Sequence, residues 1–157
     1  MTADAQGNTL VLGVGNPLMG DDGAGVLAVQ RLLARPDLPP DVAVVDGGTA
    51  GLGLIPLMEG YRRVVLVDAV LMGEPPGTVR RFEWREARVG GHEQPLSLHQ
   101  SDLADALALA EALGSLPAEV IVFGVQPQRT DWDRPLSEAV ARALPGLVDA
   151  LIAEVRS

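Results

Sequence analysis

The sequence predicts an α/β fold in which a twisted, mostly parallel sheet is covered by helices on both faces. Short apolar runs rich in β-branched residues alternate with segments of helical pattern, an order typical of parallel strands joined by helices. The runs are mostly continuous, as expected for strands buried on both faces. At 157 residues, with no linker between two cores, the chain is expected to form one αβα sandwich domain spanning residues 1–157.

The apolar runs give the expected strands. Residues 9–14 and 63–67 are almost entirely apolar, and residues 42–45 and 120–125 have the same character. Residues 77–84 instead alternate between apolar and polar side chains. This alternation predicts an extra strand, antiparallel at one edge of the sheet.

The segments between these runs carry helical patterns. They predict helices at about 22–34, 50–58, 101–113 and 136–156. Because each helix follows a strand, it can return the chain to the start of another parallel strand. The carboxyl ends of the strands then lie along one edge of the sheet, where ligands usually bind.

Composition excludes several catalytic classes. The chain has no cysteine, so it has no thiol nucleophile, thiolate metal site or disulfide. Its twelve basic residues are all arginines, which removes Schiff-base chemistry and the phosphate-binding lysine of a P-loop. The two histidines are His92 and His99, and no serine lies in a Gly-x-Ser-x-Gly elbow, so a Ser-His hydrolase is not expected.

Charge and hydropathy limit the partners. A net charge of −9 argues against nucleic-acid binding, which depends on neutralising phosphates, and leaves a metal ion or a basic peptide as possible cationic partners. No apolar run approaches the roughly 20 residues of a membrane span. Residues 1–8 are too polar for a signal peptide. A cytoplasmic protein without membrane partners is expected.

A glycine motif follows the first predicted strand. Gly13-x-Gly15 stands between a strand and a helix, as in a dinucleotide-binding fingerprint, but Leu18 occupies the place of the third glycine and Pro17 stiffens the turn. The motif alone therefore favours a strand-to-helix turn that needs flexible backbone. A nucleotide-binding α/β domain stays an alternative.

Three aspartates stand near the same predicted edge. Asp21 and Asp22 open the second element, where one carboxylate can cap the helix and leave the other free to face the crevice. Asp68 follows the apolar residues 64–67, so its carboxylate should emerge where that strand ends. A turn or capping role is the other interpretation of Asp68.

The segment Asp46-Gly47-Gly48-Thr49 follows the second predicted strand. Its glycines could expose backbone N–H groups to a substrate, or they could allow a tight turn before a helix capped by Thr49. The residues favour neither interpretation over the other.

His99 is the candidate imidazole ligand. Ser97 and Gln100 fit a capping box, which places His99 in the first turn of a helix, where the dipole favours the neutral form. His92 lies in a polar loop and receives no role. Two carboxylates and one histidine would form a three-ligand site with open positions, suited to zinc, nickel or a similar divalent ion.

In combination these motifs resemble those of the hydrogenase maturation endopeptidases. The resemblance rests on residues 13–23, on 46–51, on Val67-Asp68-Ala69 and on Leu98-His99-Gln100, in matching order. The Gly124-Val125-x-Pro127 turn and the proline-bearing last helix extend it over nearly the whole chain. The resemblance implies a single αβα domain.

The resemblance also implies an activity and a site. It implies an endopeptidase of an aspartic, nickel-dependent type that removes the C-terminal extension of a nickel-iron hydrogenase large-subunit precursor after nickel insertion. The catalytic and metal-binding positions fall on Asp22, Asp68 and His99, and many members have Glu where this chain has the shorter Asp22. Nickel comes with the substrate, so no permanently bound cofactor is expected.

Three further expectations follow. Residues Asp46, Gly47, Gly48 and Thr49 are expected to contact the substrate, and the enzyme to act as a monomer. With Asp22 as the ligand, Asp21 is left as the cap, so Asp21→Asn should be tolerated. A nickel-dependent maturation scaffold that binds precursor without shortening it would explain the ligands equally well.

Overall fold

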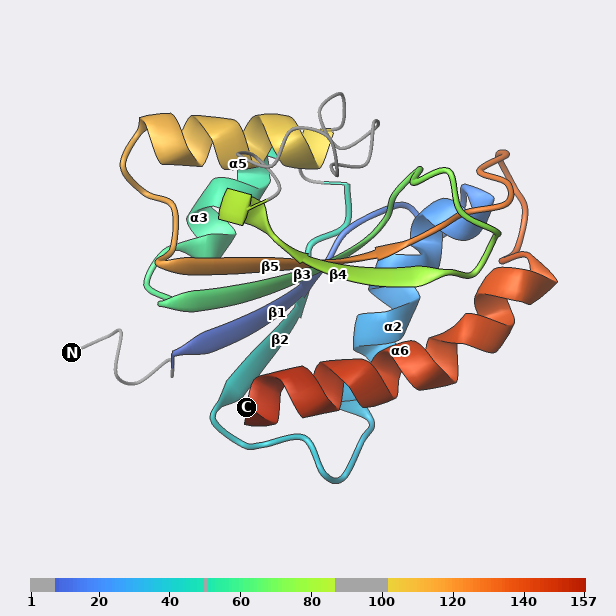
Figure 1. Cartoon of the computed structure of the whole chain (residues 1–157), viewed down its shortest axis with the longest axis horizontal. Helices are drawn as coiled ribbons and strands as arrows, with labels where there is room; N and C mark the ends of the chain where they lie inside the picture. Colours follow the sequence, from blue (N-terminus) through green and yellow to red (C-terminus); the bar gives the residue numbers. More distant parts are fainter. Residues whose placement is uncertain (1–7, 50, 87–101) are drawn as a thin grey trace.

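The computed structural model describes residues 8–49, 51–86 and 102–157, and its centre is a five-stranded sheet of order β2-β1-β3-β5-β4 (Figure 1). Strands β2, β1, β3 and β5 pair in parallel, whereas β4 pairs with β5 antiparallel. The mostly parallel sheet and its antiparallel edge strand are therefore confirmed. The strands are β1 (Thr9–Gly13), β2 (Val42–Asp46), β3 (Arg63–Ala69), β4 (Val79–Glu83) and β5 (Glu119–Val125).

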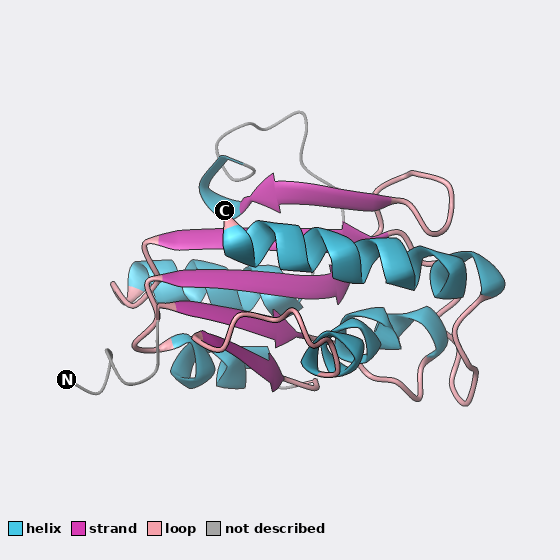
Figure 2. Cartoon of the chain, turned by 90° about the horizontal axis from the view of Figure 1, so that it is seen from below, coloured by secondary structure: helices cyan, strands magenta, loops and turns pink. Residues whose placement is uncertain are grey.

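Helices cover both faces of this sheet, as predicted. Helices α3 and α5 lie on one face and α2 and α6 on the other, and Figure 2 shows the same layers from another side. Among the described helices, none is both long and apolar enough to cross a bilayer. The helical elements are η1 (Gly20–Gly23), α2 (Ala24–Leu33), η2 (Gly51–Gly53), α3 (Leu54–Met58), α5 (Asp102–Ala112) and α6 (Glu138–Arg156).

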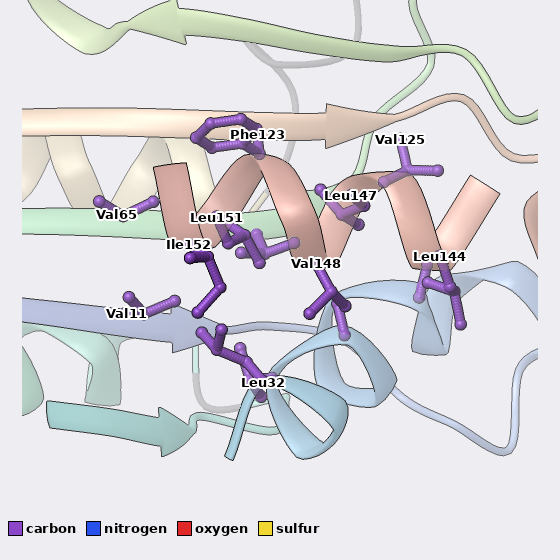
Figure 3. Close-up of a cluster of buried hydrophobic side chains, with 14 of the residues drawn as sticks. Val11, Leu32, Val65, Phe123, Val125, Leu144, Leu147, Val148, Leu151 and Ile152 are labelled. Atoms are coloured by element: carbon purple, nitrogen blue, oxygen red, sulfur yellow. The ribbon is translucent and has the colours of Figure 1, made fainter. Parts of the chain in front are cut away.

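Two apolar cores lie on opposite faces of the central strands. Along β1, Leu10 and Leu12 pack in the core under α3 and α5, whereas Val11 packs in the core under α2 and α6. Figure 3 shows the second core, in which Val11 and Val65 lie beside side chains of α6 such as Ile152. Because successive strand residues are buried on alternate faces, the strand sequences are continuously apolar.

Two predicted helices begin differently from the expectation. The helix expected at about 22–34 starts with the 3-10 turn η1, and the helix expected at 50–58 divides into the 3-10 turn η2 and the short α3. Gly51 has a positive φ of 54°, a conformation that an α-helix does not use. Asp22 lies in η1, whose last residue, Gly23, directly precedes α2.

Candidate active site

The carboxyl ends of β1, β2 and β3 meet at one edge of the sheet. Gly13 at the end of β1 pairs with Asp46 of β2 on one side and with Val67 of β3 on the other. Beyond the strands, the Gly15 N–H donates to the Gly48 carbonyl oxygen at 2.8 Å. The loops that carry three of the predicted motifs are thus held side by side.

An open pocket of about 180 Å³ lies at this edge. Asp22 and Asp68, two of the three predicted ligands, both line it, and so does Thr49. The pocket therefore combines two carboxylates and a hydroxyl with an otherwise small or apolar lining. That lining consists of Val14, Gly15, Gly51, Leu54, Ala69 and Leu103.

Asp22 is fixed by the turn that precedes it. Its carboxylate accepts a hydrogen bond from the Asn16 N–H at 2.9 Å. Gly15 has a φ of 131°, and a Cβ at Gly15 would lie 1.9 Å from the main-chain oxygen of Asp22. No L side chain fits at Gly15, so the second glycine of the Gly-x-Gly motif is accounted for by its packing against Asp22.

Asp68 lies inside the last part of β3 rather than just beyond it. Its side chain is largely buried, with a relative exposure of 9%, and its Oδ1 accepts the N–H of Ala69 at 2.8 Å. A carboxylate on a buried central strand is held more rigidly than one on a loop. The position of Asp68 in the pocket is therefore fixed by the buried strand β3.

The structure corrects the expectation that Asp21 caps its own helix. No side chain caps η1 or α2. Instead, Asp21 is completely buried and its carboxylate accepts four hydrogen bonds from a distant segment. The donors are the N–H groups of Gln128 and Arg129 and both the N–H and the hydroxyl of Ser137, at 2.7–3.1 Å.

These hydrogen bonds decide the charge of Asp21. Burial by itself raises the pKa of a carboxyl group, but the bonds from Ser137, Gln128 and Arg129 lower the Asp21 pKa by more. Asp21 is thus an anion at neutral pH. Its two oxygens are occupied by donors of the chain, so it is an anchor and not a second ligand beside Asp22.

The segment after β2 is a turn that leads into the pocket. The Asp46 carboxylate accepts the Gly48 N–H at 2.8 Å, and Gly48 has a positive φ of 55°. Thr49 does not cap α3, because the residue at that cap is Gly53 and no side chain bonds there. Of the four residues expected to contact substrate, only Thr49 is part of the described pocket lining.

His99 and His92 lie outside the residues that the structure describes. Leu103 near the start of α5, four residues beyond His99, lines the pocket. Within the described residues no group of three histidine, cysteine, aspartate or glutamate side chains is placed to hold a metal ion. The described part of the site thus contains two members of the predicted ligand set, Asp22 and Asp68.

Neither the apolar lining of the pocket nor the partners of Asp21 were expected from the sequence. Leu54 and Leu103 look like ordinary core positions of helices, and only their position next to the glycine turn and the predicted histidine could have suggested a pocket. Asp21 and Ser137 are 116 residues apart. No local pattern could have joined them.

The fold and the pocket define an α/β protein whose site presents carboxylates at the carboxyl edge of a parallel sheet, without thiol or lysine chemistry. The chain belongs to the hydrogenase maturation protease family, whose family model matches residues 26–154. It is thus a hydrolase of the peptidase class that acts in hydrogenase maturation. The dinucleotide alternative finds no support in this relationship.

Known relatives cover most of the chain. A hydrogenase expression/formation protein HupD of Rhizobium leguminosarum bv. viciae is 34% identical over 149 residues, which span 94% of this chain and 74% of the relative. The hydrogenase 2 maturation protease of Escherichia coli K12 is 32% identical over 148 residues, spanning 94% and 90%. The solved structure of the hydrogenase maturating endopeptidase HybD from E. coli matches with a TM-score of 0.80 at 30% identity, covering 95% of this chain and 92% of that one.

Proposed function

We propose that this protein is an endopeptidase that removes the C-terminal extension from the nickel-loaded large-subunit precursor of a nickel-iron hydrogenase. The observation that carries the proposal is the pairing of Asp22 and Asp68 in one pocket at the carboxyl edge of the sheet. Family membership supplies the reaction class. The relatives named as hydrogenase proteases support the choice of substrate.

In this proposal the nickel ion belongs to the substrate and is what the enzyme recognises. Asp22, Asp68 and His99 would hold it, since carboxylate and imidazole donors suit such a divalent ion. Three protein ligands leave positions for the ligands that the precursor already provides. Because three protein ligands without a thiolate bind such an ion only modestly, the enzyme alone is not expected to hold one permanently.

The substrate nickel would bring the scissile peptide bond next to the two carboxylates. A divalent ion can polarise a carbonyl group or lower the pKa of a bound water, and either effect promotes hydrolysis. The enzyme contributes placement: Asp68 stands on a buried strand and the Asp22 carboxylate is fixed by the Asn16 N–H. Such preorganised charge needs little rearrangement during the reaction.

Two observations support the remaining site assignments. Leu103 belongs to the pocket lining, and His99 precedes it by only four residues, which span at most about 14 Å. Thr49 also lines the pocket, so it is placed to contact the substrate, while Asp46, Gly47 and Gly48 form the turn that precedes it. We further propose that the enzyme acts as a cytoplasmic monomer.

The test is incubation of the purified protein with a nickel-loaded precursor, followed by mass spectrometry. The proposal predicts a shortened large subunit and a released C-terminal peptide. Asp22→Asn and Asp68→Asn should abolish this product, whereas Asp41→Asn, a matched change of an exposed aspartate just before the start of β2, should not. A stable complex with an unshortened precursor would instead favour a maturation scaffold.

A further inference from the structure

The turn that carries Asp22 is attached to a second loop at the same end of the molecule. Residues 18–21 run beside residues 129–134: the Asp21 N–H donates to the Arg129 carbonyl oxygen at 2.8 Å, and the Gly20 N–H donates to that of Arg134 at 3.0 Å. A bridge between Met19 and Arg134 continues the pairing. The two loops therefore form one backbone unit.

Asp21 closes this unit with its side chain. Its Oδ1 accepts the Ser137 N–H, while its Oδ2 accepts the Ser137 hydroxyl and the N–H groups of Gln128 and Arg129. Ser137 is in turn the N-cap of α6, where its hydroxyl accepts the Val140 N–H at 3.4 Å. One buried carboxylate thus ties the η1 turn to the start of a helix of 19 residues.

The carboxylate of Asp22, the next residue, accepts fewer described hydrogen bonds than that of Asp21. Asp22 accepts the Asn16 N–H with its carboxylate, and its main chain packs against Gly15. Both contacts lie within residues 15–22, a turn whose first residues are bonded to the loop after β2 through the Gly15 N–H and the Gly48 carbonyl oxygen. At the other end of the turn, the side-chain hydrogen bonds to the loop 128–137 come from Asp21.

We propose that Asp21 is a positioning residue that holds Asp22 at the correct place in the pocket by fixing the η1 turn to the loop 128–137. The inference rests on the proposed function, in which Asp22 contacts the substrate nickel. Asp21 itself touches neither the ion nor the substrate. Loss of a residue that orients a metal ligand typically costs about 10- to 100-fold in activity.

The test measures kcat and KM for processing of the nickel-loaded precursor by the full-length enzyme. Asp21→Asn leaves one acceptor oxygen for four donors, so the η1 turn should lose its side-chain anchor and keep only its main-chain bonds to residues 129–134. We expect kcat per folded molecule to fall about 10- to 100-fold, with KM changed less than about threefold. Leu151→Ala, a buried change near the far end of α6, provides a destabilised control whose kcat should equal that of the wild type.

A double-mutant cycle separates positioning from a merely structural effect. Asp22→Glu lengthens the ligand, so its carboxylate can partly compensate for a displaced turn. The loss caused by Asp21→Asn should therefore be smaller in the Asp22→Glu background than in the wild type. Equal losses in both backgrounds would overturn the inference. If Asp21→Asn does not fold, the same cycle is measured with Ser137→Ala, which removes one of the four donors.

Failure of the inference is distinguishable from failure of the proposed function. If the wild type does not shorten the precursor, the proposed function is wrong and the inference fails with it. If the wild type cuts, Asp22→Asn does not, and Asp21→Asn keeps the wild-type kcat, only the positioning role is wrong.

Discussion

Asp21→Asn should be one of the most destabilising conservative substitutions in this chain. The amide oxygen can replace only one of the two carboxylate oxygens. If it takes the place of Oδ1, the amide NH₂ faces the N–H groups of Gln128 and Arg129; if it takes the place of Oδ2, the NH₂ faces the Ser137 N–H. In either orientation at least one buried main-chain donor lacks an acceptor.

The size of the effect follows from these contacts. A buried donor without an acceptor costs about 1–3 kcal/mol, and the bonds that remain lose the added strength of a charged acceptor. We therefore expect a loss of about 2–4 kcal/mol in the free energy of unfolding. For a domain of this size the corresponding decrease in Tm is about 5–15 °C.

Urea unfolding, followed by far-ultraviolet circular dichroism, measures this difference. Asp22→Asn is the matched control, because the described contacts of the Asp22 carboxylate comprise the single bond from Asn16. It should lose less than about 1 kcal/mol. If Asp21→Asn unfolds within about 0.5 kcal/mol of the wild type, the four hydrogen bonds do not stabilise the fold as we argue.

The same comparison has a predictable dependence on pH. The Asp21 pKa is lowered in the folded protein below its unfolded value of 3.8, so ionised Asp21 stabilises the fold above that pH. This stabilisation disappears as the pH falls through the lowered pKa. The difference between wild type and Asp21→Asn should therefore be constant near neutral pH and shrink below pH 3.8. A difference that grows in acid would contradict the assignment.

Four further substitutions test the site and the fold. His99→Ala should abolish processing with little loss of structure by circular dichroism, whereas His92→Ala should process normally; activity in the first variant would remove that residue from the site. Gly15→Ala places a methyl group against the main chain of Asp22, so we expect a lower Tm and a loss of processing. A variant with the Tm and activity of the wild type would contradict this close packing. Glu154→Gln removes one of the two carboxylate partners of the buried Arg63, along with the partner of Arg81, and should cost about 2–3 kcal/mol in urea unfolding. A neutral result would show that Glu119, the other carboxylate partner of Arg63, suffices.

The fold was predictable because its signal is local. Strands such as β1 and β3 are buried on both faces, so their sequences are continuously apolar and easily distinguished from amphipathic helices. The alternation within 77–84 likewise reflects the edge position of β4. The boundaries of the helices were less accurate where glycines and the buried Asp21 replace the first α-helical turn with a 3-10 turn.

The candidate site was predictable only in part. The positions of Asp22 and Asp68 near the carboxyl ends of predicted parallel strands were sufficient to place both at one edge of the sheet, and both line the pocket. The role of Asp21 was wrong, because its donors come from a segment more than 100 residues away and a helix-start aspartate looks like a cap in sequence. The alternative in which Thr49 caps the following helix does not hold for α3, because η2 lies between them and the residue at that cap is Gly53.

The central proposal is that the enzyme recognises its substrate through the nickel ion that the precursor carries. The direct measurement compares the initial rates at which one preparation of enzyme shortens nickel-loaded and nickel-free precursor, with product masses determined for both. Because Asp22, Asp68 and His99 are proposed to contact that ion, we predict cleavage of the loaded precursor and none of the nickel-free form. Equal cleavage of the two precursors would contradict the claim.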